Sequence, residues 1–127
     1  MKCFEFILYV ADQERSTEFY RQLFQQDPVL NVPGMTEFEP IPGCKLGLMP
    51  ERGIAKIIGG KTPDPASGSG IPRCEIYLLV EDIQPYYERA QALSAVRVSD
   101  IGERNWGHRV CYFADADGHI LAFAEEM

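Results

Sequence analysis

Long apolar runs, basic clusters and closely paired cysteines are all missing from this chain of 127 residues. No hydrophobic stretch approaches the roughly 18 residues that a membrane span needs, so we expect no membrane segment. An acid follows the first methionine almost at once, without a small-residue cleavage pattern, so we also expect no signal peptide. The 19 Asp and Glu outnumber the 12 Lys and Arg, giving a formal charge of −7. A chain of this charge repels phosphate backbones, so we expect no nucleic-acid binding.

The cysteines form neither a CxxC pair nor a dense framework. Each lies near strand-like apolar residues, which predicts buried thiols in a reducing, cytoplasmic compartment. A zinc site of four cysteines needs close ligand pairs, and these are absent. A P-loop, a dinucleotide fingerprint and a serine elbow are absent too. The four cysteines are Cys3, Cys44, Cys74 and Cys111.

The sequence does contain an internal repeat, at an offset of 70 residues. Residues 5–12 (EFILYVAD) match residues 75–82 (EIYLLVED). Each copy is followed by apolar residues at helical spacing, with Asp12 or Asp82 as the expected N-cap. Three extended runs then follow in each half, predicted at 29–32, 36–39 and 44–49, and at 95–99, 108–113 and 119–124. The order β-α-β-β-β is therefore expected twice.

This order predicts an α+β fold in which two βαβββ modules form a curled mixed sheet around a cleft, with the helices on the outer face. We expect one domain over residues 1–127. Its first module is residues 1–57 and its second is residues 72–127. Residues 58–71 between them are rich in Gly, Pro and Ser, which is typical of a flexible linker or flap.

Alternation along the first strand separates two faces. Phe4, Phe6, Leu8 and Val10 are expected to pack under the helix, which leaves Glu5 on the opposite face. Glu75 takes the equivalent place in the second copy, so the repeat predicts that the two carboxylates meet in the cleft. Two carboxylates in an apolar cleft bind a hard cation, or one acts as a general base with a raised pKa. The alternative is that both are solvated at strand ends and simply survive from the duplication.

Four further residues are candidates for ligand binding. Trp106 can cover a ligand, or else plug the open end of the sheet. Arg109 can hold an anionic group, or else pair with a surface acid. Lys45 can balance the glutamates, although a solvated lysine is the commoner case. Tyr77 is expected on the cleft face, two residues after Glu75.

The sequence does not favour a metal-binding or catalytic role for either histidine. His108 and Cys111 are three residues apart on a strand, and so on opposite faces, which argues against a shared zinc site or a nucleophile pair. His119 follows a predicted hairpin turn, Asp115-Ala116-Asp117-Gly118, and is expected to be a surface residue.

Three stretches resemble the vicinal oxygen chelate superfamily, which includes glyoxalase I, the fosfomycin- and bleomycin-resistance proteins and the extradiol dioxygenases. They are residues 16–24 (STEFYRQLF), 77–82 (YLLVED) and 106–119 (WGHRVCYFADADGH). In metal-dependent members of the superfamily, the first and last strands of each half supply the ligands. Glu5 and Glu75 match the two first-strand positions. Gly47 and Ala122 fall at the two last-strand positions, and neither has a donor side chain.

The resemblance therefore implies a glyoxalase- or bleomycin-resistance-like protein that binds a small cationic or aromatic molecule in the cleft between its modules. In this interpretation no cofactor is expected, although a weakly held divalent metal is conceivable. Glu5 and Glu75 would supply charge, and Tyr77, Trp106, Arg109 and Lys45 would contact the ligand. The alternative is a metal-dependent lyase or isomerase of glyoxalase type, with Glu5 or Glu75 as the base. A homodimer is expected, because subunit contact would cover apolar strand edges.

Overall fold

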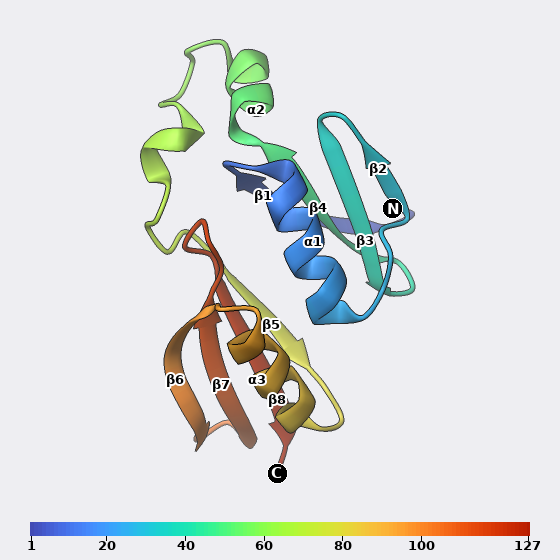
Figure 1. The fold of residues 1–127 in the computed structure, drawn as a ribbon, viewed down its shortest axis with the longest axis vertical. Coiled ribbons are helices and arrows are strands. Elements are labelled where there is room, and N and C mark those ends of the chain that lie inside the picture. The colour runs from blue at the N-terminus through green and yellow to red at the C-terminus, as the bar shows by residue number, and fades with distance from the viewer. The chain divides into compact units, whose positions relative to one another are not determined.

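The computed structural model describes all 127 residues, and its elements follow the predicted order twice (Figure 1). The first module contains β1 (Phe4–Val10), α1 (Gln13–Phe24), β2 (Leu30–Val32), β3 (Met35–Ile41) and β4 (Cys44–Pro50). The second contains β5 (Glu75–Leu79), α3 (Ile83–Ala92), β6 (Val96–Glu103), β7 (His108–Ala114) and β8 (Ile120–Glu126). The α+β class and the two βαβββ modules are thus confirmed.

The strands form two four-stranded mixed sheets, one in each module. Their orders are β1-β4-β3-β2 and β5-β8-β7-β6, so the last strand of a module lies beside its first. This first–last pair is parallel in both modules, with Ile7 opposite Gly47 and Tyr77 opposite Ala122. The two sheets therefore share one strand order and one first–last pairing. The chain divides into two compact units, Met1–Ser69 and Gly70–Met127.

Each main helix starts at the aspartate that the repeat predicts and covers one face of its own sheet (Figure 1). The Asp12 carboxylate accepts a hydrogen bond from the Arg15 amide at 3.0 Å, and the Asp82 carboxylate accepts one from the Gln84 amide at 3.0 Å. These bonds satisfy backbone donors that have no partner within the helix. Among the fully buried side chains are Tyr20 and Leu23 of α1 in the first module, and Phe113, Leu121 and Phe123 in the second.

Packing under α1 differs from expectation at the start of β1. Leu8 and Val10 are buried, but Phe6 is 38% exposed and Phe4 is 62% exposed. The reason is that β1 is an edge strand, and α1 packs over its neighbour β4 and over β3 beyond it. The prediction that all four side chains lie under the helix was therefore wrong for Phe4 and largely wrong for Phe6.

Two short helical segments that the sequence pattern did not predict follow β4: α2 (Glu51–Ile58) and the 3-10 helix η1 (Pro65–Gly68). Helix α2 begins directly where β4 ends, and Gly53 in its first turn weakens the helical signal. At η1, the Asp64 carboxylate accepts a hydrogen bond from the Ala66 amide at 2.9 Å. None of the helices is long and apolar enough to cross a membrane.

The thiols are less buried than predicted. Only Cys111 is buried, Cys74 is half-buried, and Cys3 and Cys44 are exposed. Cys44 opens β4 beside Phe4, at the end of the first sheet that α1 leaves uncovered. The expectation of four buried thiols was therefore wrong for both cysteines of the first module.

Candidate functional site

Each sheet has an open face, which lies opposite α1 in the first module and opposite α3 in the second. On the first open face, Glu5, Glu37 and Lys45 gather around Gly47. Glu5 lies beside Lys45 in the register of β1 and β4, and Glu37 lies beside Gly47 in the register of β3 and β4. The Lys45 ammonium is 3.5 Å from the Glu37 carboxylate. The lysine that we expected to balance Glu5 or Glu75 thus pairs with a residue outside the predicted set.

Glu5 reaches across β4 into the space above Gly47. A Cβ atom added at position 47 would lie 2.6 Å from Glu5 Oε2. That oxygen is buried and has no hydrogen-bond partner. Burial raises the pKa of Glu5 above its ordinary value, and the neighbouring Glu37 carboxyl raises it further. Lys45 acts in the opposite direction on this pKa, and the charge of Glu37 in turn raises the pKa of Lys45.

These side chains do not fit the metal site that the resemblance implies. Gly47 and Ala122 lie at matching positions beside the first strand of each sheet, and neither offers a donor atom. In the first module, the carboxylate of Glu5 already fills the space in which a side chain at position 47 would lie. A lysine ammonium also sits within the same cluster and repels a divalent ion. A site with four protein donors cannot form from these residues.

On the second open face, Tyr77, Trp106 and His108 are joined by hydrogen bonds. The Trp106 indole donates to the Tyr77 hydroxyl at 2.9 Å, and that hydroxyl is 2.8 Å from His108 Nδ1. The Tyr77 and His108 rings lie with centroids 5.9 Å apart. The structure thus brings two of the predicted ligand-binding residues together with His108, which the sequence suggested only as an improbable partner of Cys111.

Glu75 opens β5, is exposed, and lies beside Ile120 in the register. It belongs to the second compact unit, whereas Glu5 belongs to the first. A direct approach of the two carboxylates therefore stays a prediction. Within its own module, Glu5 has Glu37 as its carboxylate neighbour, a partner that the repeat could not reveal because position 37 lies outside the repeated segment.

Arg109 follows His108 and so lies on the other face of β7, towards α3. Its guanidinium forms an ion pair with Glu125. The second oxygen of Glu125 accepts a hydrogen bond from the Ile83 amide at 2.8 Å, at the start of α3. Arg109 therefore helps to tie β7, β8 and α3 together, and a contact between it and a ligand stays a prediction.

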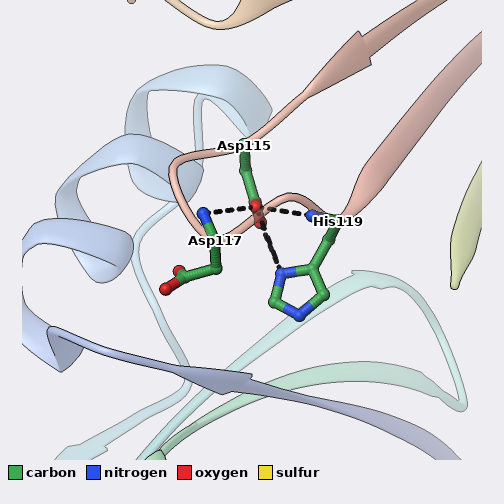
Figure 2. A group of neighbouring side chains, drawn as sticks. All are labelled: Asp115, Asp117 and His119. Atoms are coloured by element: carbon green, nitrogen blue, oxygen red, sulfur yellow. Dashed lines mark hydrogen bonds and ion pairs between the residues drawn. The ribbon is translucent and has the colours of Figure 1, made fainter. Parts of the chain in front are cut away.

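The turn before β8 contains the residues Asp115, Asp117 and His119 (Figure 2). One ligand atom from each lies within 4.8 Å of the others, as a small metal site would require. However, Asp115 Oδ1 accepts hydrogen bonds from the amides of Asp117 and His119, at 3.0 and 2.9 Å. His119 Nδ1 is 2.9 Å from Asp115 Oδ2, and His119 Nε2 is 3.1 Å from the Arg73 guanidinium. Both ring nitrogens are already bonded, so the group stabilises the turn.

His119 is only 2% exposed, so the expectation of a surface histidine was wrong. The reason is that Asp115 binds the backbone two and four residues ahead and draws the ring inward. The four-residue spacing of Asp115 and His119 around Gly118 was the signal available in the sequence.

Comparison with known proteins gives one consistent picture. The family model of the glyoxalase-like domain matches residues 3–127. An uncharacterized protein of Mycobacterium bovis is 28% identical over 123 residues, covering 94% of this chain and 80% of that protein. A glyoxalase-related enzyme from Fulvimarina pelagi superposes with a TM-score of 0.81 at 21% identity, covering 99% of this chain and 88% of that one.

Lactoylglutathione lyase from Agrobacterium tumefaciens superposes with a TM-score of 0.73, also at 21% identity, covering 96% of this chain and 91% of that one. At this level of identity, the two structural likenesses show a shared fold and nothing finer.

Proposed function

Because the chain belongs to the glyoxalase-like family of the vicinal oxygen chelate superfamily, we propose that it binds a small organic molecule on its open sheet faces without a tightly held metal ion. One observation carries this proposal: Gly47 and Ala122 supply no donor, and Glu5 fills the space beside Gly47. Tyr77 and Trp106 are exposed aromatic surfaces for the ligand. Glu5, Glu75 and Lys45 are the charged groups proposed beside it.

Metal analysis of the purified protein tests this proposal. Elemental analysis, followed by calorimetric titration with nickel, zinc and manganese, should find no stoichiometric metal. Ligand-detected NMR with a library of small molecules should find binders to the same metal-free protein. A stoichiometric divalent ion that is lost in both Glu5→Ala and Glu75→Ala would overturn the metal-free assignment. Failure of every compound to bind would overturn the binding assignment.

A second candidate function is a lyase or isomerase of glyoxalase type with Glu5 as the base. The raised pKa of Glu5 and its unpartnered buried oxygen favour it, because a carboxylate of this kind accepts a proton more readily than a solvated one. The name of the Agrobacterium protein, lactoylglutathione lyase, gives the assay, which is turnover of lactoylglutathione. Turnover that Glu5→Gln abolishes and Glu75→Gln leaves in place would support this candidate. Absence of turnover in the native protein would exclude that substrate.

We also propose that the protein is a homodimer. Apolar side chains at strand positions remain exposed in both modules, including Phe4 at 62%, Leu79 at 51% and Val96 at 63%. Their burial against a second copy would be favourable. Light scattering coupled to size exclusion should give twice the chain mass of 14.3 kDa, and a monomeric mass at micromolar concentration would refute the proposal.

A further inference from the structure

The hydrogen-bonded group on the second module joins three separate segments: β5, the loop before β7, and β7 itself. Tyr77 lies beside Ala122 in the register, whereas His108 lies beside Glu126, four residues further along β8. To reach His108 Nδ1 at 2.8 Å, the Tyr77 side chain must cross β8 diagonally. It can do so because the β8 side chains on this face, Ala122 and Ala124, are small. Both alanines are fully buried.

One assignment of the protons satisfies all three groups. An indole nitrogen can only donate, so the Tyr77 oxygen accepts from Trp106. In this assignment, the Tyr77 hydroxyl donates its own proton to His108 Nδ1, which lies 2.8 Å away. A nitrogen that accepts this bond carries no proton, so neutral His108 holds its proton on Nε2. In this assignment, His108 Nε2 is the one remaining N–H donor of the group.

The surface around this donor is largely aromatic. Trp106 is 53% exposed and Tyr77 is 37% exposed, so each ring presents part of its surface to a ligand. A third ring, Tyr112, lies on the same face with the Arg104 guanidinium 5.4 Å from its centroid. The acids on this face are Glu75, two residues before Tyr77 on β5, and Glu126, which lies directly beside His108 in the register.

We propose that Tyr77, Trp106 and His108 form a recognition site for a planar aromatic molecule that carries an acceptor oxygen, as a carboxylate or carbonyl group. The ligand ring packs against Trp106 and Tyr77, and the His108 Nε2–H donates to its oxygen. His108 is the specificity-determining residue, and Tyr77 is the positioning residue that fixes the tautomer of His108. This inference rests on the proposed small-molecule binding and narrows it to one ligand class.

The tautomer is tested first and needs no ligand. In the ¹⁵N NMR spectrum of the native protein, His108 Nδ1 should resonate as a bare nitrogen and Nε2 as a protonated one. In Tyr77→Phe the two forms should mix, since the bond that selects one of them is gone. In Tyr112→Phe, which removes a hydroxyl from the same face without touching this group, the native pattern should persist. A proton on Nδ1 in the native protein would overturn the inference.

The ligand class is tested with benzoate and benzamidine, which have similar size and planarity but opposite hydrogen-bonding character. Trp106 is the only tryptophan, so its fluorescence reports on this site alone. Benzoate should change the fluorescence saturably and bind more tightly than benzamidine. In His108→Phe, which keeps a ring and removes the donor, benzoate affinity should fall about tenfold, as expected for a lost hydrogen bond to a charged group. In Tyr86→Phe, on helix α3 at the opposite face of the sheet, it should be unchanged.

Tighter binding of benzamidine, or no saturable response to either probe, would overturn the inference. The proposed function fails separately, because it requires only that some molecule bind anywhere on the protein. Compounds that bind by NMR without changing Trp106 fluorescence would keep the proposed function and refute this site.

Discussion

The two modules share one backbone plan and differ in the chemistry of their open faces. In each, a side chain from the first strand lies over a small residue of the last strand: Glu5 over Gly47, and Tyr77 across Ala122. In the first module, the Glu5 side chain has charged neighbours, Glu37 and Lys45. In the second module, the Tyr77 side chain is hydrogen-bonded to the rings of Trp106 and His108. Duplication thus preserved the register of the strands, while the side chains that use it diverged.

The largest difference in stability between matched substitutions is expected in the turns that precede the last strand of each module. Gly118 has φ of +90°, and a Cβ there would lie 2.7 Å from the backbone of Gly70. Gly43, in the corresponding turn of the first module, has φ of +82° but open space around it. Gly118→Ala should cost about 2–4 kcal/mol, combining strain with a clash, against about 1–2 kcal/mol for Gly43→Ala from strain alone. Urea unfolding measures both, and equal costs would contradict the expected clash.

The next largest loss of stability is expected when the small residues beneath Tyr77 and Glu5 are enlarged. Ala122 is fully buried, so Ala122→Val should cost about 1–3 kcal/mol and change Trp106 fluorescence by displacing Tyr77. Gly47→Ala should cost less, because the nearest atom is the flexible end of Glu5. It should also lower the pKa of Glu5 towards its ordinary value, because the carboxyl moves outward. Thermal unfolding and a carboxyl NMR titration check these outcomes, and an unchanged pKa in Gly47→Ala would show that Glu5 does not occupy this space.

A smaller effect concerns pH. Burial in the folded state raises the pKa of Glu5 above its ordinary value, so the folded state holds this proton to higher pH than the unfolded chain. Stability from this group is therefore present at low pH and is lost as pH rises through the raised pKa. Glu5→Gln should stabilise the protein at about pH 7 and have little effect at about pH 4.

The control for this prediction is Glu75→Gln, at the equivalent position of the second module, which is exposed and lies beside Ile120. Its effect should depend less on pH. Urea unfolding at the two pH values measures the free energy of unfolding. If this free energy changed with pH equally in Glu5→Gln and in the native protein, the prediction would be contradicted.

The last prediction concerns the rates at which the four thiols react, with no change in stability. Burial raises the pKa of Cys111 to about 11, so almost none of it is thiolate at neutral pH. Cys3 and Cys44 are exposed in the first module. In native protein, a maleimide should label Cys3 and Cys44 first, Cys74 slowly because burial raises the pKa of its thiol, and Cys111 only after unfolding. Mass spectrometry of labelled peptides checks the order, and early labelling of Cys111 would refute it.

The sequence predicts the features that follow from the internal repeat and from alternation along a strand. The offset of 70 residues predicts both modules, both helix N-caps and the equivalence of Glu5 with Glu75. Alternation along β5 predicts the face of Tyr77, but it says nothing of Trp106, which lies in the loop before β7. These are properties of local spacing, and a single chain displays them without knowledge of which strands pair.

Features that depend on pairing between strands could not be predicted. Glu37 contacts Glu5 only because β3 and β1 both flank β4 in a particular register. His108 meets Tyr77 across β8, although 31 residues separate them in the chain. Arg109 is three residues from Trp106, yet it lies on the opposite face and pairs with Glu125. Closeness in sequence was misleading there.

The parallel pairing of first and last strands also sets where a module begins and ends. Because β1 and β4 run in the same direction, the chain enters at one rim of the sheet and leaves at the other. Seven paired residues separate the two rims by roughly 23 Å. A circular permutant of one module would therefore need a connector of at least seven extended residues. Head-to-tail copying needs no such connector within the module, which makes tandem duplication an easy evolutionary route for this unit.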